Sequence, residues 1–344
     1  MPHRRIANER LTAAALLVGL AIGLSACGAG VSKVAKTSAP SSATTTTSTD
    51  PSTSTAGTST STSTSTLPGT GKPMITIGDK NYTEQFVLGE LYAQALQADG
   101  YTVELNRNIG PTDVTIQALQ SGRLAMYPEY LDTWDSAVAG LRRSFRTEVG
   151  AYAAAQPYAS AHGLSLLDPT PFSSTFALGV TVAYSSQNRL RSLGDLRRVA
   201  QSLNLGGPPQ FQQSAGLPAV EQAYGFTPAT FTELALGDQY TALNAGSVQA
   251  AYVGTTDGEL ASGDYILLRD PRRAFGFGNV IPVVSSKVLA TEGPAFAGVI
   301  DGVSAALSVA AIRQMNAAVD IAQLDPATVA KQFLETHGLI PPSP

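Results

Sequence analysis

Apolar side chains in the first part of the folded region follow two periods in turn, one typical of strands and one typical of helices. The stretch 74–78 (Met-Ile-Thr-Ile-Gly) is strand-like and stops at glycine. Residues 87–96 then repeat apolar side chains at helical spacing until Asp99-Gly100 ends the pattern. Because the polar segment 81–84 precedes this run and Glu84 is placed to reach back to its start, the pattern predicts a capped helix.

The alternation continues with a second strand at 102–105, a second helix that Thr112 caps and 121–122 ends, and a third strand at 124–127. This order of strands and helices predicts a parallel sheet with helices on both faces. Ligands of such sheets bind beyond the carboxyl ends of the strands. We therefore expect three loops to lie on one rim, namely 78–84, 110–112 and 128–133.

The rest of the chain repeats this pattern less clearly. Strand-like runs occupy 176–183, 248–253, 266–268 and 280–284, and Gly194-Asp195-Leu196 opens a helix. Residues 296–332 are rich in alanine with little glycine or proline, which predicts helices. About 270 residues follow residue 73, enough for two domains of typical size or one large one.

The N-terminal tract is of a different kind. Residues 1–26 contain Arg4, Arg5 and Arg10 and then an uncharged run, which is the layout of a secretory signal peptide. The uncharged run is too short, and too soon followed by polar sequence, for a stable membrane span. It ends in Leu-Ser-Ala-Cys, which resembles the lipobox of bacterial lipoproteins. The resemblance implies that Cys27 becomes the lipidated N-terminus and anchors the protein by acyl chains. As the only cysteine, Cys27 cannot be half of an intramolecular disulfide.

Residues 27–73 consist mostly of small and hydroxyl-bearing residues with no apolar stripe to bury. We interpret this segment as a disordered tether, whose Ser and Thr density would also permit O-glycosylation. The whole chain has 22 Lys and Arg against 26 Asp and Glu, and loss of residues 1–26 would remove three basic residues and one acidic residue, leaving 19 against 25. No basic patch suggests nucleic acid.

The residues needed for common catalytic chemistry are missing. Only His162 and His337 follow the signal peptide, and no free cysteine remains, so neither a Ser-His-acid triad nor a Cys-His pair has its parts. No phosphate-binding loop, nucleophile elbow or zinc spacing is present. Glu84, Glu129 and Asp132 offer carboxylates for acid–base work, but surface or helix-cap roles explain them more simply. We expect a protein that is not an enzyme and that uses no cofactor or metal.

Two segments resemble a known family. Residues 77–85 (Ile-Gly-Asp-Lys-Asn-Tyr-Thr-Glu-Gln) and 127–133 (Tyr-Pro-Glu-Tyr-Leu-Asp-Thr) are similar to motifs of the substrate-binding proteins of glycine betaine, choline and carnitine ABC importers, where the first motif begins Gly-Ser-Lys-Asn-Phe-Thr-Glu-Gln. Weaker similarity continues through 211–225, 251–258 and 279–284. The resemblance implies an α/β fold of the type II periplasmic-binding-protein class, with two lobes, two crossovers and a ligand cleft. The lobes would be 74–176 with its return 280–344, and 177–279.

In that family a box of aromatic rings holds the quaternary ammonium group of the ligand by cation–π attraction. Carried over by position, the resemblance assigns ligand binding to Tyr130, Thr133, Phe176 and Tyr252, with Phe277 or Phe275 in place of a fourth tyrosine. We assign Tyr92 and Tyr127 to the core, and Trp134 either to the box or to packing behind it.

One departure concerns the ligand carboxylate. Betaine binders have a basic residue near the position of 211–216, and this segment contains none, which leaves Lys80 as the candidate anion partner. The missing basic residue therefore favours a choline-like or other ligand more strongly than in a typical member of the family.

The resemblance implies an extracytoplasmic, lipid-anchored monomer that delivers a quaternary-amine osmoprotectant to an ABC permease. The alternatives are a tethered ligand-sensing domain, a binder of another small polar solute, and a lipoprotein hydrolase. Tethering by lipid, without a transmembrane or cytoplasmic domain, favours transport.

Overall fold

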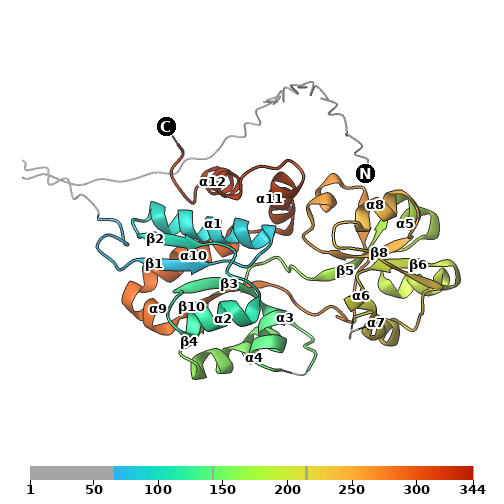
Figure 1. Cartoon of the computed structure of the whole chain (residues 1–344), viewed down its shortest axis with the longest axis horizontal. Coiled ribbons are helices and arrows are strands. Elements are labelled where there is room, and N and C mark those ends of the chain that lie inside the picture. The colour runs from blue at the N-terminus through green and yellow to red at the C-terminus, as the bar shows by residue number, and fades with distance from the viewer. Residues whose placement is uncertain (1–65, 142, 214–215, 344) are drawn as a thin grey trace, which may run out of the picture. The chain divides into compact units, whose positions relative to one another are not determined.

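Two five-stranded sheets organise the computed structural model, which describes residues 66–141, 143–213 and 216–343 (Figure 1). The predicted signal peptide, Cys27 and most of the predicted tether lie outside the described residues. The first sheet has the order β2 (Val103–Asn106), β1 (Ile75–Gly78), β3 (Met126–Tyr130), β10 (Val280–Ser285) and β4 (Leu164–Leu166). The second has the order β7 (Thr230–Glu233), β6 (Asn204–Gly207), β8 (Ala250–Gly254), β5 (Phe176–Thr181) and β9 (Tyr265–Leu267).

Helices fill the connections between the strands. They are α1 (Thr83–Ala98), α2 (Thr112–Gln120), α3 (Leu131–Thr133), α4 (Glu148–Ala161), α5 (Val182–Asn188), α6 (Pro209–Gln213), α7 (Gly216–Tyr224), α8 (Gln239–Asn244), α9 (Ser286–Glu292), α10 (Pro294–Ala306), α11 (Val309–Asp320) and α12 (Pro326–Thr336). A π-helical turn covers Trp134–Val138, and tight 3₁₀ turns cover Leu193–Arg198, Ala200–Ser202 and Gly258–Ser262. Among the described helices none is by itself long and apolar enough to cross a membrane; only α10 and α11 together pass that test, bent by 88° between them.

The predicted βαβαβ unit is confirmed, because β1 is parallel to both β2 and β3. β10 enters the same sheet antiparallel to β3 and β4, which makes the sheet mixed. The chain passes to the second sheet between β4 and β5 and returns between β9 and β10, so the second sheet is built only from strands of residues 176–267.

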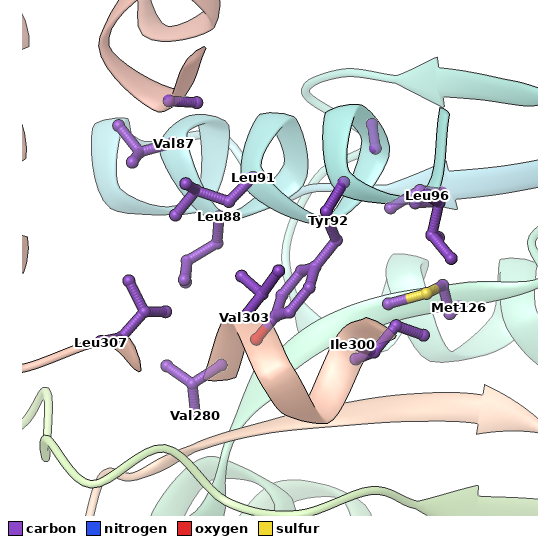
Figure 2. Packing of buried hydrophobic residues seen from close by; sticks show 14 of the residues in the cluster. Val87, Leu88, Leu91, Tyr92, Leu96, Met126, Val280, Ile300, Val303 and Leu307 are labelled. Atoms are coloured by element: carbon purple, nitrogen blue, oxygen red, sulfur yellow. The ribbon is translucent and has the colours of Figure 1, made fainter. Parts of the chain in front are cut away.

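Both faces of the first sheet are covered. Val280 and Val284 of β10 point to the face covered by α1 and α10, whereas Ile281 and Val283 point to the face covered by α2 and α4. Figure 2 shows the first of these clusters, in which Tyr92 reaches from α1 toward α10. The Tyr92 hydroxyl lies 2.9 Å from the Ser304 hydroxyl, so its polar end has a partner. Tyr92 and Tyr127 are fully buried, as predicted.

The third strand differs from its prediction. It begins at Met126 and runs to Tyr130, through residues that were expected to form a loop. β10 supplies an antiparallel partner for every residue of β3, and Pro128 lies opposite Pro282, where neither residue has an N–H to donate. On its other side β3 pairs with β1 only at Met126, so the missing donor of Pro128 disturbs no ladder there.

Both predicted helix caps are wrong. α1 begins at Thr83 without a side-chain cap, and the Glu84 carboxylate accepts hydrogen bonds from Tyr130 and Asn316 instead. Thr112 is the first residue of α2, and its hydroxyl accepts from Lys80. In both cases partners far away in the sequence occupy oxygens that a local pattern assigns to the helix end. In addition, the strand expected at 176–183 ends at Thr181, and the helix expected at 194–196 is a tight helical turn.

α11 connects the two sheets. Its Arg313 Nε donates to the Thr255 carbonyl at 2.8 Å, and its Asn316 Nδ2 donates to the Thr256 carbonyl at 2.8 Å, just after β8. The turn Gly258–Ser262 packs against α11 so closely that a Cβ on Gly258 would lie 2.7 Å from the Ala317 backbone. Glycine is therefore required sterically at this contact.

We expect Gly258→Ala to lower the free energy of unfolding by about 1–3 kcal/mol, because the colliding atoms belong to backbone that cannot rotate away. Gly298→Ala is the matched control: Gly298 is exposed on α10 with no atom within 4 Å of the added Cβ, so helix propensity should leave stability equal or higher. Chemical denaturation measures both. A Gly258→Ala variant as stable as the wild type would show that α11 can move away at no cost.

Candidate binding site

A cavity of about 480 Å³ lies where the carboxyl ends of β1, β3 and β8 meet the start of β5 and the end of α11. Its lining comprises Tyr82, Thr83, Glu84, Tyr130, Asp132, Thr133, Ser174, Thr175, Phe176, Leu236, Gly254, Thr256, Asp257, Asn316 and Asp320. The predicted rim segments 78–84 and 128–133 both contribute, and 110–112 does not. Strand ends place the site where α/β sheets commonly bind ligands.

Aromatic rings from both sheets line the cavity. Tyr82 and Tyr130 stack with ring centroids 6.1 Å apart, and Tyr130 donates its hydroxyl to Glu84 at 2.8 Å. From the second sheet, Phe176 is 45 % exposed and stacks on Tyr252, with the centroids 4.4 Å apart. Tyr252 in turn stacks on Phe211 at 4.1 Å, so a packed column of rings fixes the orientation of Phe176.

The charged residues of the lining are all acidic: Glu84, Asp132, Asp257 and Asp320. None of them has an ion-pair partner within the described ranges. Burial raises the pKa of Asp132 to about 6. The hydrogen bond from the Thr133 N–H acts in the opposite direction but is the smaller effect. Burial likewise raises the pKa of Asp257 to about 6, although Tyr240 and the Gly254 N–H donate to its Oδ2.

The raised pKa values have a consequence for folding. The folded carboxyls hold their protons more tightly than the unfolded ones, whose pKa is 3.8. The stability that they contribute is therefore lost as pH rises from 3.8 to about 6. Around neutral pH the cavity holds negative charge that the protein only partly compensates.

Lys80 is not part of the lining. Its side chain is buried, its ammonium group forms an ion pair with Glu129, and it donates to the Thr112 hydroxyl at 2.9 Å. The nitrogen lies 5.6 Å from the centre of the Tyr130 ring, so Lys80 supports that ring from within the protein. The structure thus gives Lys80 a buried partner and not the place on the cavity wall that was predicted for it.

The other predicted site residues divide into two groups. Tyr130, Thr133 and Phe176 line the cavity together, and Tyr252 lies directly behind Phe176. Phe277 and Phe275 line two neighbouring cavities instead, where the Arg273 guanidinium lies 4.9 Å from the Phe277 ring centre. Trp134 is completely buried and donates its Nε1–H to the Ala155 carbonyl, so it packs behind the site.

Sequence reasoning missed Tyr82, Glu84 and Asn316 as site residues. A signal for Tyr82 was present, since the family motif carries an aromatic residue at the same position as Tyr82. Asn316 had no local signal, because it stands 232 residues after Glu84, to which it donates a hydrogen bond. Within the described ranges, no group of three or more His, Cys, Asp and Glu side chains is placed to hold a metal ion.

Comparison with known proteins identifies the class. The family model for the substrate-binding domain of the ABC-type glycine betaine transport system matches residues 73–336. The chain belongs to this family of extracytoplasmic solute-binding proteins, and its fold is that of the type II periplasmic binding proteins, as the sequence resemblance predicted.

Individual relatives agree with this assignment. The chain is 32% identical to the glycine-betaine-binding protein of Pseudomonas aeruginosa over 279 residues, covering 77% of this chain and 88% of the relative. It is 30% identical to the glycine betaine-binding protein YehZ of Escherichia coli, covering 79% and 93%. Among solved structures, a glycine betaine/carnitine/choline ABC transporter protein superimposes with a TM-score of 0.73 at 22% identity, and apo YehZ with 0.68 at 29%, each covering 77% of this chain and 99% of the other.

We expect Lys80→Met to lower the free energy of unfolding by about 3–5 kcal/mol, because Glu129 would remain buried without its cation. Lys80→Met combined with Glu129→Leu should recover most of this loss. Lys331→Met is a matched control, since the Lys331 side chain is 52% exposed and its pair with Glu335 should contribute only about 0–1 kcal/mol. Denaturant titrations compare the variants, and a double variant no more stable than the single one would contradict the role of the charge pair.

Proposed function

We propose that this protein captures a small solute carrying a quaternary ammonium group outside the cytoplasmic membrane and delivers it to an ABC permease, without catalysing a reaction on it. One observation carries the proposal: ring faces from both sheets and four carboxylates line one cavity, and that lining contains no lysine or arginine. The family membership of the chain supports the transport role.

The chemistry of the cavity suits such a ligand. A quaternary ammonium group has no N–H to donate, so it gains little from hydrogen-bond acceptors and much from the negative faces of aromatic rings. Tyr82, Tyr130 and Phe176 offer such rings on the cavity wall. Carboxylates around the rings add attraction that needs no directed bond.

The names of the relatives point to the same ligand class. Two of them are glycine-betaine-binding proteins, and a protein of Listeria monocytogenes with 23% identity is a carnitine transport binding protein. We propose that the protein is a monomer whose two lobes close around the ligand. The lobes are close to those predicted, 74–176 with 280–344 and 177–279, except that Phe176 begins β5 and so belongs to the second lobe.

Phe176→Ala should weaken choline binding by about five- to thirtyfold, the loss of one cation–π contact, with little change in stability because Phe176 is 45 % exposed. Tyr252→Ala removes the middle ring of the stack and should in addition cost about 3 kcal/mol of folding stability. Calorimetric titration and chemical denaturation separate the two effects. Unchanged choline affinity in Phe176→Ala would exclude Phe176 from the binding site.

The anchoring of the protein is part of the proposal. The Leu-Ser-Ala-Cys sequence after an uncharged run supports lipidation of Cys27. The tether predicted at 27–73 is shorter than expected at its end, because the Gly69 N–H donates to the Asp99 carbonyl and Lys72 Nζ donates to the Thr291 carbonyl of the binding domain.

Cys27→Ala should move the protein from the membrane fraction to the medium, because the acyl chains would be lost, while the melting temperature of the binding domain stays the same. Cell fractionation with immunoblotting measures this, and Ser25→Thr, two residues earlier, is a control for disturbance of export. A Cys27→Ala protein that remains in the membrane fraction would overturn the lipid anchor.

A further inference from the structure

The buried glutamates of β3 and α1 differ in how their charge is compensated. Glu129 pairs with Lys80, and Glu90 pairs with Arg107. Glu84 is 5% exposed and accepts hydrogen bonds from two neutral donors, the Tyr130 hydroxyl and Asn316 Nδ2, at 2.8 and 3.0 Å. Of these three carboxylates, Glu84 is the one that lines the cavity.

Neutral donors stabilise a buried carboxylate without cancelling its charge, and a desolvated charge without a counter-ion is costly. The nearby cations of the protein are held elsewhere: the Lys80 ammonium binds Glu129, and Arg313 Nε donates to the Thr255 carbonyl. Asp132, Asp257 and Asp320 add to the negative charge around the same space. A cation from outside the chain would compensate this negative charge.

Asn316 provides a second, independent observation. It is 4% exposed, it lines the cavity, and its Nδ2 donates to both Glu84 Oε2 and the Thr256 carbonyl. Because both neighbours can only accept, the orientation of the amide is fixed and Oδ1 must be the remaining atom. Oδ1 is buried and has no hydrogen-bond partner among the described residues. A group that donates a hydrogen bond would satisfy it.

From these two observations we infer that the cavity selects an organic cation that carries a hydrogen-bond donor and no carboxylate, of which choline is the simplest example, over a zwitterionic betaine. The cation compensates Glu84, and the hydroxyl donates to Asn316 Oδ1. A betaine brings the same ammonium, but its carboxylate has no donor to offer Asn316 and meets four like charges. This inference rests on the proposed function and narrows its ligand class.

The test is calorimetric titration of the full chain with choline, glycine betaine and the neutral analogue of choline in which carbon replaces the ammonium nitrogen. The wild type should bind choline at least about tenfold more tightly than either of the other two. In Glu84→Gln the new side chain can still accept from Asn316 and donate to the Tyr130 oxygen, so the shape of the site is kept while the charge is lost. Choline affinity should fall by about tenfold in this variant. Betaine affinity should fall by less than about threefold, because Glu84 attracts the ammonium of betaine and repels its carboxylate, and the two effects partly cancel.

Glu104→Gln makes the same charge change at an exposed position of β2 that does not line the cavity, and distance and screening by solvent should keep its effect on either ligand below about threefold. The inference is overturned if the wild type binds betaine as tightly as choline, or if Glu84→Gln lowers both affinities by the same factor. Should Glu84→Gln fail to fold, the wild-type affinity ratios still decide. If the wild type binds none of the quaternary amines, the proposed function itself fails.

Discussion

A chain of hydrogen bonds from Tyr130 through Glu84 and Asn316 to the Thr256 carbonyl connects the two sheets at the binding cavity. Tyr130 ends β3, Glu84 lies in the first turn of α1, and Asn316 lies on α11, so three elements of the first sheet region meet the loop after β8. These hydrogen bonds together fix the orientation of the Tyr130 ring, the Glu84 carboxylate and the Asn316 amide. They depend on close packing of α11, which the glycine at 258 allows.

Compensation of charge distinguishes the buried Glu129 from the carboxylates of the cavity. Glu129 is buried together with Lys80, and removal of either partner would leave an isolated charge. At the site, Glu84, Asp132 and Asp257 lack such partners within the described residues. Carboxylates that lack a counter-ion lower the stability of the unliganded fold and make the binding of a cation more favourable. Such a loss of stability in return for binding is expected at a functional site.

The aromatic residues show the same division. Phe176 lines the cavity, and Tyr252 and Phe211 behind it connect that ring by stacking to the hydrophobic core of the second sheet. Trp134, Tyr127 and Tyr92 are fully buried and belong to the core, although each is of a type that also builds cation boxes. Position on the cavity wall, and not residue type, distinguishes Tyr82, Tyr130 and Phe176 from these core rings.

The sequence by itself determined the elements and much of the fold. Hydrophobic period predicted β1, α1, β2 and α2, because it reports which side chains of one local segment must be buried. Family motifs placed Tyr130, Thr133 and Phe176 at one cavity, since each lies at or just beyond the end of a strand whose position the fold preserves. The tertiary structure alone decided the roles of Lys80, Glu84 and Asn316. Lys80 finds Glu129 49 residues away and Glu84 finds Asn316 232 residues away. A local sequence pattern cannot predict partners that only the folded chain brings together. The charge balance of the cavity therefore follows from the tertiary structure and not from the sequence pattern.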